Sequence, residues 1–251
     1  MTAVQSPDLG SAARLVSITV ADDPSAWASA GFTVVDDAVQ IAGTRIVLTG
    51  RVDDRSLRGI RNWTVAGLSA PAGDGQIDGL ATSFVDVTSL DDTSTAGTST
   101  AGTSTVQDTA STAVHANGTA GIDHVVVITP DLDRTIAAFA EVGLGVRRIR
   151  ETESYGAPMR QAFLRLGPVI VEVVGGHEGS GQRAEEAPAD WFGLALDVGD
   201  LGATATLLGD GLGGIKDAVQ DGRRIATIRH KNFGMSVATA LMDDLASVDG
   251  A

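Results

Sequence analysis

Apolar and polar positions between residues 122 and 174 change period in an order that predicts a strand, a helix and three further strands. The β-branched run Ile122 to Thr129 is typical of a buried strand. Apolar residues then recur at helical spacing from Leu132, and Gly143 lies where such a helix commonly ends. The three strands expected next are Val146 to Glu153, Arg160 to Leu166 and Val169 to Val174. The predicted order is βαβββ.

The same order repeats in the following 50 residues. A strand at residues 191–198 and a helix at 201–208 precede strands predicted at 215–219, 224–229 and 236–241. The two units align without a gap, and this alignment places Gly193 opposite His124. Internal repetition on this scale indicates that neither unit buries its apolar face alone. We therefore expect one domain over residues 121–245.

The N-terminal region, residues 12–87, shows a fainter form of the same pattern. A strand, a short helix and three strands are predicted up to Thr49, but no helix separates the strand at 60–68 from the apolar stretch at 77–87. We interpret this region as a degenerate tandem copy. Residues 88–120 repeat TSTAG and read as a linker, because small side chains offer little apolar area to offset the entropy of ordering. His115 and the sequon that begins at Asn117 fall in this stretch and receive no role.

Charge and cysteine content exclude several classes of function. The formal net charge of -14 repels phosphate polymers and anionic lipid, so we expect no nucleic-acid or membrane partner. The absence of cysteine removes thiolate metal ligands and cysteine nucleophiles. No apolar run approaches the ~20 residues that cross a bilayer, and the chain starts with no signal-peptide pattern, so we expect a cytoplasmic protein.

Residues 121–242 resemble the vicinal oxygen chelate superfamily of glyoxalases, bleomycin-resistance proteins and extradiol dioxygenases. The resemblance rests on the strand Ile-Asp-His-Val-Val-Val, the helix opening Pro-Asp-Leu, the strand Val-Ile-Val-Glu-Val-Val and the duplication of the whole unit. It implies an α+β fold in which paired βαβββ modules form a half-open barrel. It also implies a small-molecule ligand in the barrel, and it allows a homodimer.

The resemblance further implies a divalent metal ion held by a His from a first strand and a Glu from a last strand. His124 and Glu172 match these positions, and their donor atoms suit Zn²⁺, Mn²⁺, Fe²⁺ or Ni²⁺. Gly193 replaces the second His, and the strand at 236–242 has no carboxylate. A catalytic metal generally needs about three protein ligands, so the set is incomplete. Substitute ligands, or a hydrogen-bonded pair without metal, stay open; the substitutes considered are Gln161, Glu153 and His230.

Residues that could bind the ligand follow from the apolar strand faces. Phe163, Trp191, Phe192 and Met235 could wall a pocket, and Arg160, Arg165 or Arg224 could meet a carboxylate or enolate. Alternation allows only one of Arg160 and Phe163, and one of Trp191 and Phe192, to face the inside of the barrel.

Three readings of function are open at this point. The first is a metal-dependent lyase, isomerase or dioxygenase in which Glu172 is a ligand or a base. The second is a metal-free protein that binds a small molecule without catalysis, which the missing ligands favour. The third gives the N-terminal copy a role in assembly.

Overall fold

A computed structural model describes residues 13–54, 57–71, 75–87, 113–154, 157–176 and 186–243. These residues form two mixed sheets, one of seven strands and one of eight. The TSTAG repeats lie outside the described residues. No helix in the described ranges is long and apolar enough to cross a membrane.

The eight-stranded sheet contains both predicted βαβββ units. The first unit comprises β8 (Thr119–Thr129), α3 (Leu132–Glu141), β9 (Val146–Ser154), β10 (Ala157–Leu166) and β11 (Val169–Gly176). The second comprises β12 (Asp190–Val198), α4 (Leu201–Leu208), β13 (Lys216–Asp217), β14 (Arg224–Thr227) and β15 (Ala238–Asp243). A 3-10 turn (Gly209–Gly211) follows α4 directly, and the four-residue helix α5 (His230–Phe233) lies between β14 and β15. The strand order is β13-β14-β15-β12-β8-β11-β10-β9.

The strand register confirms the internal repeat. β8 pairs antiparallel with β12, and each of them pairs in parallel with the last strand of its own unit. His124 lies opposite Ala195, and Val126 lies opposite Gly193, so a two-fold rotation exchanges His124 with Gly193. The helices repeat as well, because Asp131 and Asp200 accept hydrogen bonds from backbone N–H groups in the first turns of α3 and α4.

The seven-stranded sheet repeats this order in reduced form. It contains β1 (Arg14–Val20), α1 (Pro24–Ser29), β2 (Val34–Val35), β3 (Ala38–Ile41), β4 (Thr44–Leu48), β5 (Ile60–Ala66), β6 (Gln76–Ile77) and β7 (Leu80–Val85). β1 pairs in parallel with β4 and antiparallel with β5, as β8 does with β11 and β12. No helix lies between β5 and β6 among the described residues. The apolar stretch predicted at 77–87 is instead a hairpin, because Asp78 and Gly79 both adopt positive φ and turn the chain.

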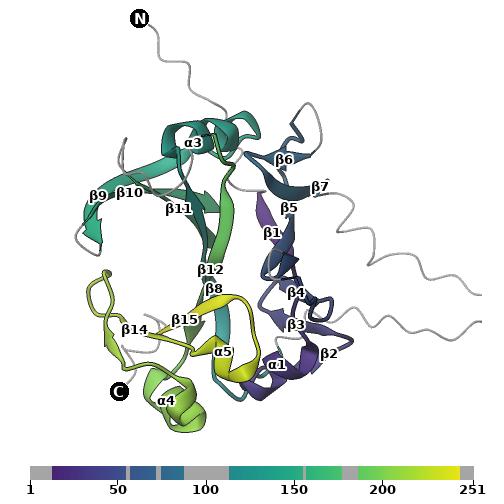
Figure 1. Ribbon diagram of the computed structural model, residues 1–251, viewed down its shortest axis with the longest axis vertical. Coiled ribbons are helices and arrows are strands. Elements are labelled where there is room, and N and C mark those ends of the chain that lie inside the picture. The colour runs from purple at the N-terminus through teal and green to yellow at the C-terminus, as the bar shows by residue number, and fades with distance from the viewer. Residues whose placement is uncertain are drawn as a thin grey trace, which may run out of the picture.

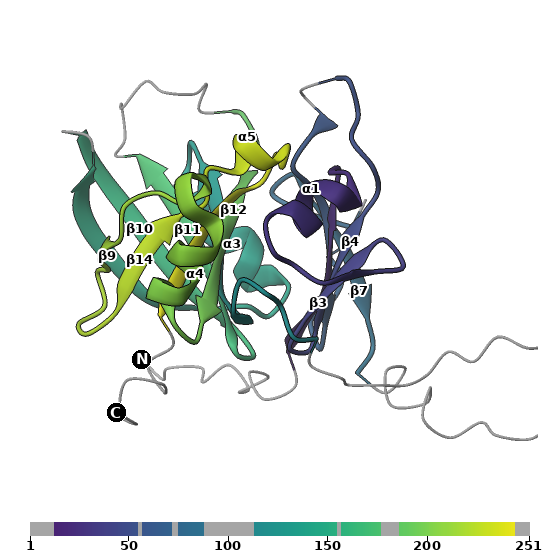
Figure 2. The same ribbon diagram turned by 90° about the horizontal axis from the view of Figure 1, so that it is seen from below.

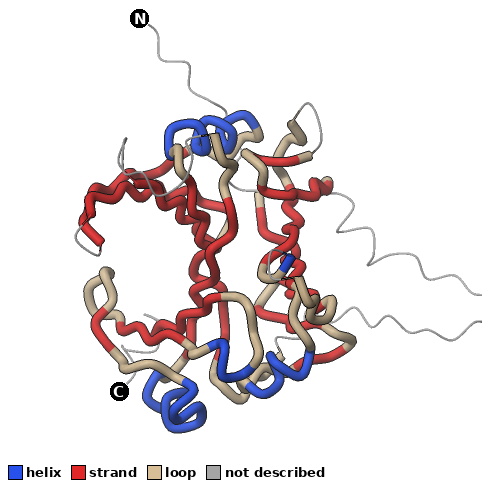
Figure 3. The backbone as a smooth tube through the Cα atoms, viewed as in Figure 1, coloured by secondary structure: helices blue, strands red, loops and turns tan. Residues whose placement is uncertain are grey.

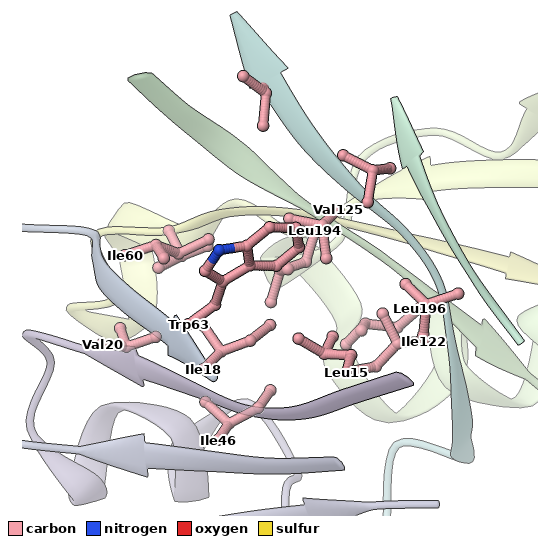
Figure 4. Close-up of a cluster of buried hydrophobic side chains, with 14 of the residues drawn as sticks. Leu15, Ile18, Val20, Ile46, Ile60, Trp63, Ile122, Val125, Leu194 and Leu196 are labelled. Carbon is pink, nitrogen blue, oxygen red and sulfur yellow. The ribbon is translucent and has the colours of Figure 1, made fainter. Parts of the chain in front are cut away.

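The two sheets pack back to back through one apolar core (Figure 1). Trp63 of β5 is fully buried and lies with Ile18 of β1 against Val125 and Leu194 of the other sheet (Figure 4). The Trp63 ring also meets the Trp191 ring edge-on, at a centroid distance of 5.0 Å. The seven-stranded sheet therefore covers the outer face of the eight-stranded one.

Polar contacts join the sheets at both ends of this core. Asp22, which is 1% exposed, accepts hydrogen bonds from Trp27 Nε1 and from the backbone N–H and hydroxyl of Ser236. Asp78, in the β6–β7 turn, accepts two hydrogen bonds from the Arg134 guanidinium of α3. The two copies are thus held in one arrangement by buried charged groups as well as by apolar packing.

Residues 113–118, which composition assigned to the linker, pack against the N-terminal copy. The His115 ring bridges the Thr33 N–H at 3.0 Å and the Gln40 carbonyl at 3.0 Å. Asn117 is fully buried and donates to the Ala30 carbonyl. Composition missed this segment because its stabilisation comes from a few specific hydrogen bonds to distant residues rather than from apolar area.

The opposite face of the eight-stranded sheet is concave and carries no helix among the described residues. The strands curl away from the seven-stranded sheet in Figure 1, and the strand trace of Figure 3 follows the same curve. Figure 2 shows, from below, the two sheets as separate layers. We refer to this surface as the concave face.

Replacing Asp22 with alanine should destabilise the whole described fold, because it leaves the Trp27 and Ser236 donors buried without an acceptor. Removing one partner of a buried hydrogen-bonded group typically costs about 1–3 kcal/mol, and more when the group is charged. Urea unfolding should show one transition at a lower midpoint. Asp221→Ala, at an exposed position, is the control; equal midpoints for the two variants would contradict this role of Asp22.

Acid should weaken the contact made by His115. Burial lowers the pKa of His115 below its ordinary value of 6.5, although the hydrogen bond to Gln40 opposes this. The unfolded chain therefore binds the proton first, and stability falls as the pH drops from about 6.5 through the folded-state pKa. We expect the difference in melting temperature between wild type and His115→Gln to shrink over this range. A difference that stays constant from pH 8 to pH 5 would be inconsistent with a buried neutral imidazole.

Candidate functional site

Side chains alternate between a buried outer face and a partly accessible concave face along each central strand. On β11, Val171 and Val173 are fully buried, whereas Glu172 between them is half-buried. On β8, Val125 is fully buried and Val126 is half-buried. Strand alternation therefore delivers every second residue to the concave face.

His124 and Glu172 meet on this face. Nε2 of His124 lies 3.4 Å from Oε2 of Glu172, and the two side chains are 16% and 13% exposed. Parallel pairing of β8 and β11 produces the contact, because His124 lies opposite Ile170, two residues before Glu172. The pair singled out from the sequence is thus brought together, within reach of solvent and of a ligand.

A β-bulge places Asp123 on the same face as His124. Ala195 pairs with His124 and Leu196 pairs with Ile122, so Asp123 is an extra residue with no partner on β12. In a regular strand, neighbouring side chains point to opposite faces, and a bulge removes this alternation locally. Oδ1 of Asp123 consequently lies 2.6 Å from Nδ1 of His124.

Arg223 fixes Asp123 from the other side. Its guanidinium, which is 5% exposed, donates to Oδ2 of Asp123 at 2.6 Å, to Asp197, and to the backbone carbonyl of Asp243. Burial of Asp123 opposes ionisation, but hydrogen bonds from His124 and Arg223 outweigh it and hold its pKa below the usual value. Asp123 is therefore an anchored carboxylate that accepts a hydrogen bond from Nδ1–H of His124.

The proton count of His124 decides the nature of its contact with Glu172. An imidazole with a single proton on Nδ1 would present the Nε2 lone pair to a carboxylate that has only lone pairs to offer, whereas a doubly protonated imidazole donates to it. The contact becomes favourable when a proton resides on one of the two groups or when a cation lies between them. The pair therefore needs a proton, a cation or a ligand donor between its two groups.

Burial disfavours the ionised form of Glu172. Burial raises its pKa above the ordinary value of 4.5, and the nearby His124, the hydrogen bond from Gln161 and the charge of Arg150 oppose only part of this effect. Nε2 of Gln161 donates to Glu172 at 2.6 Å, whereas Oε1 of Gln161 is buried without a partner. An orphaned buried acceptor beside a raised carboxyl pKa indicates a site organised for a donor that comes from outside.

The metal expected from the fold can be tested against these donors. A Zn²⁺ ion binds His nitrogen and carboxylate oxygen at about 2.0–2.2 Å, so two donors on one ion lie roughly 3–3.5 Å apart. The His124 and Glu172 donors, 3.4 Å apart, fit this requirement. However, the described residues contain no group of three or more His, Asp or Glu side chains that could hold an ion. The residues present therefore supply half of a catalytic site and do not complete it.

The second module shows why the other half is missing. Gly193 and Ala240 occupy the positions that the two-fold axis relates to His124 and Glu172. A Cβ atom at Gly193 would lie 2.1 Å from the Ala238 carbonyl oxygen, far inside van der Waals contact. A histidine at position 193 would require β12 and β15 to move apart.

The structure distributes the predicted ligand-binding residues over several surfaces. Phe163 pairs with Glu172 across β10 and β11 and shares the concave face. Arg160 points the other way and forms an ion pair with Asp133 of α3, with nitrogen–oxygen distances of 3.0 and 3.2 Å. Arg160 therefore does not belong to the concave face.

Trp191 and Phe192 do not line the concave face as a pocket wall. Trp191 packs on Trp63 between the sheets, and Phe192, which is 56% exposed, is the extra residue of a bulge between the paired residues Trp191 and Gly193. Both border a pocket of about 300 Å³ between the two copies, together with Arg58 and Arg61. Their aromatic side chains serve the junction between the copies rather than the His124 site.

Sequence reasoning missed Asp123, Arg150 and Arg223. Asp123 stands in the motif that carried the family resemblance, but regular alternation assigns it to the opposite face from His124. Arg223 is 100 residues away from Asp123, and no short-range pattern connects them. Of the three substitute ligands that the sequence offers, only Gln161 contacts Glu172. Glu153 is exposed on β9, and His230 lies at the start of α5, near Asp22.

Comparison with solved structures identifies the architecture. A triple variant of 4-hydroxymandelate synthase from Streptomyces coelicolor superimposes with a TM-score of 0.58 at 14% identity, over 93% of this chain and 92% of that chain. The chain has the vicinal oxygen chelate fold. Tandem copies of that fold account for both sheets, and the α+β class predicted from the sequence is confirmed.

Two further solved structures match the chain over different spans. A fusion of a xylose isomerase-like TIM barrel with 4-hydroxyphenylpyruvate dioxygenase matches 92% of this chain and 48% of its own length, with a TM-score of 0.54 and 12% identity. Methylmalonyl-CoA epimerase from Mycobacterium tuberculosis matches 53% of this chain and 94% of its own, with a TM-score of 0.41 and 22% identity. No protein-family model matches the sequence, and no curated protein is significantly similar to it.

Replacing Glu172 with glutamine should stabilise the protein increasingly as the pH rises. Because the folded-state pKa of Glu172 is raised above 4.5, wild type loses stability as the pH rises through that value, whereas glutamine does not titrate. Melting temperatures measured from pH 4.5 to pH 8 should diverge in favour of the variant. Glu153→Gln, at an exposed position of β9, is the control. A variant that melts below wild type at pH 8 would show that the ionised carboxylate is stabilising.

Proposed function

We propose that the protein binds a small molecule on the concave face, directly beside His124 and Glu172, without a resident metal. The observation that supports this proposal is the contact between Nε2 of His124 and Oε2 of Glu172, which lie 3.4 Å apart on a half-buried surface. A shared proton, or a ligand group that donates two hydrogen bonds, satisfies both atoms. The incomplete donor set of the second module favours this reading over a metal centre.

The surroundings of the pair provide apolar walls. Val126, Ile128 and Phe163 are half-buried on the first module. On the second module the facing positions carry the small residues Gly193, Ala195, Ala238 and Ala240. Apolar walls with a few convergent polar groups are typical of small-molecule sites. The polar half therefore orients a ligand, and the half-buried Ala238 and Ala240 border it on the second module.

The pair also has the chemistry for proton transfer. Burial shifts the pKa of Glu172 upward, toward neutral pH. A general base is most effective when its pKa lies near the working pH. His124, oriented by Asp123, can hold or return a proton through Nε2. Abstraction of a proton next to a ligand carbonyl is the reaction that these two groups support best, with Glu172 as the base.

A second candidate function is a metal-dependent lyase, isomerase or dioxygenase. The separation of the His124 and Glu172 donors favours it, because that separation suits two ligands of one ion. In this case the bound small molecule supplies the donors that Gly193 and Ala240 cannot. The N-terminal copy has the same structural part in both candidates, since it covers the outer face of the sheet.

A thermal-shift experiment with Zn²⁺, Mn²⁺, Fe²⁺ and Ni²⁺ separates the two candidates. We expect wild type and His124→Ala to respond equally to each ion, because two protein donors hold a cation weakly. The neutral fluorescent probe N-phenyl-1-naphthylamine should nevertheless bind wild type at one saturable site. Ala240→Phe, which fills the concave face, should weaken that binding at least ten-fold.

Ile149→Phe is the matched control, because it also adds a ring, at an exposed position of β9 whose strand neighbour on β10, Ala162, is buried on the outer face. It should leave probe binding unchanged. A metal-induced rise in melting temperature that is lost in His124→Ala would replace the proposal with the metal-dependent candidate. Absence of probe binding in wild type, or equal binding by Ala240→Phe, would refute a ligand site on the concave face.

A further inference from the structure

Three arginines stand along one side of the concave face. Arg150 of β9 lies directly opposite Gln161 of β10, whose amide bonds Glu172. Arg148 lies opposite Phe163, and Phe163 lies opposite Glu172. Directly opposite side chains on one face are about 4.5–5.5 Å apart at Cβ. Both arginines therefore lie on β9, two strands away from Glu172 on β11 and three away from His124 on β8.

Arg165 continues this row on β10. It lies opposite Ile170 of β11, and Ile170 lies opposite His124 of β8. Arg148, Arg150 and Arg165 thus end three successive cross-strand rows, and we call them the arginine wall. The rows themselves contain Gln161, Phe163 and Ile170, so the wall adjoins both the polar pair and apolar surface.

The charges of β9 are sorted between its two faces. Arg148 and Arg150 pair with the concave residues Phe163 and Gln161, whereas Glu151 pairs with Arg160 on the outer face. In a chain with a net charge of -14, two arginines on the concave face of one strand, with the glutamate on the other face, create a local positive field.

The arginine wall is also not neutralised within the protein. Among the residues that the structure describes, no carboxylate lies within 4.0 Å of the Arg148, Arg150 or Arg165 guanidinium groups. Other arginines, such as Arg160, Arg223 and Arg224, each have an acidic partner. Arg150 is half-buried and acts on Glu172 only through its charge. The most enclosed arginine of the wall therefore keeps its planar donors for another acceptor.

We infer that the ligand of the concave face is a small organic carboxylate, whose carboxylate group binds Arg150 within the arginine wall and whose apolar body extends over Phe163. This inference rests on the proposed ligand site and adds the chemical class of its occupant. A guanidinium binds a carboxylate through two parallel charge-assisted hydrogen bonds. The unpartnered Oε1 of Gln161, next to Arg150 across the strands, accepts from a hydroxyl group of the same molecule.

A carboxylate suits this surface better than a phosphate ester does. Glu172 lies in the same rows, and its negative charge repels a dianion more strongly than a monoanion. Arg148 and Arg165 are exposed, so their attraction is screened by salt, and only Arg150 is half-buried. One enclosed guanidinium matches one singly charged group.

Two fluorescent probes of nearly the same shape test the inference. 8-Anilinonaphthalene-1-sulfonate carries a negative charge that N-phenyl-1-naphthylamine lacks. We expect wild type to bind the anionic probe at least ten-fold more tightly than the neutral probe. Arg150→Gln should remove this preference, weakening the anionic probe about ten-fold while leaving the neutral one unchanged. Arg160→Gln, which removes a charge from the outer face of β10, should change neither.

Competition then identifies the anionic group. Hexanoate should displace the anionic probe, and hexanamide at the same concentration should not. Displacement by hexyl phosphate at lower concentration than hexanoate would overturn the assignment to a carboxylate. Equal binding of both probes, or an unchanged preference in Arg150→Gln, would overturn the role of the arginine wall but leave the ligand site standing. Failure of both probes to bind wild type would instead refute the proposed function.

Discussion

Burial of the outer face of the eight-stranded sheet is the constraint on which the rest of the structure depends. Val125, Leu194 and Leu196 are buried there, and α3 and α4 cannot cover the middle of the sheet. The seven-stranded sheet covers it with Trp63 and its neighbours. A fully buried aromatic or branched side chain contributes about 1.5–3 kcal/mol. Because the core is made on this side, the concave face is free to carry ionisable groups that a core would exclude.

The candidate site then follows from one extra residue in β8. Without the bulge, Asp123 would point into the apolar layer between the sheets, where an unpaired carboxylate is strongly unfavourable. With the bulge, Asp123 meets Arg223 and orients His124 toward Glu172. The anchored carboxylate holds a proton on Nδ1 of the imidazole and leaves Nε2 facing Glu172. Local backbone irregularity therefore determines the chemistry of the face.

Repeating patterns allowed most of the fold to be predicted from the sequence, because they reflect the alternation of individual strands. The two βαβββ units and the exchange of His124 with Gly193 are both borne out by strand pairing. Alternation also stated correctly that Arg160 and Phe163 lie on opposite faces, but it could not say which faces the inside. The pairing of Arg160 with Asp133 decides this, and it depends on where α3 packs.

Other features depend on contacts that no local pattern encodes. Trp191 looks like a pocket wall in the sequence, yet its ring is used to join the two copies through Trp63. His115 lies in a stretch of small residues, and only its hydrogen bonds to Thr33 and Gln40 keep it in place. In each case the deciding partner belongs to the N-terminal copy, whose own pattern is weak. Sequence periodicity identifies the faces of an element but not the element that will cover them.

The asymmetry between the modules has a steric origin as well as a chemical one. Close approach of β12 and β15 at Gly193 and Ala238 leaves no room for a ligand side chain in the second module. A single substitution at position 193 could not restore one, since the strands would first have to separate. The small residues Gly193 and Ala238 permit this approach of the two strands. The absence of a metal-binding histidine at position 193 is thus a consequence of close strand contact.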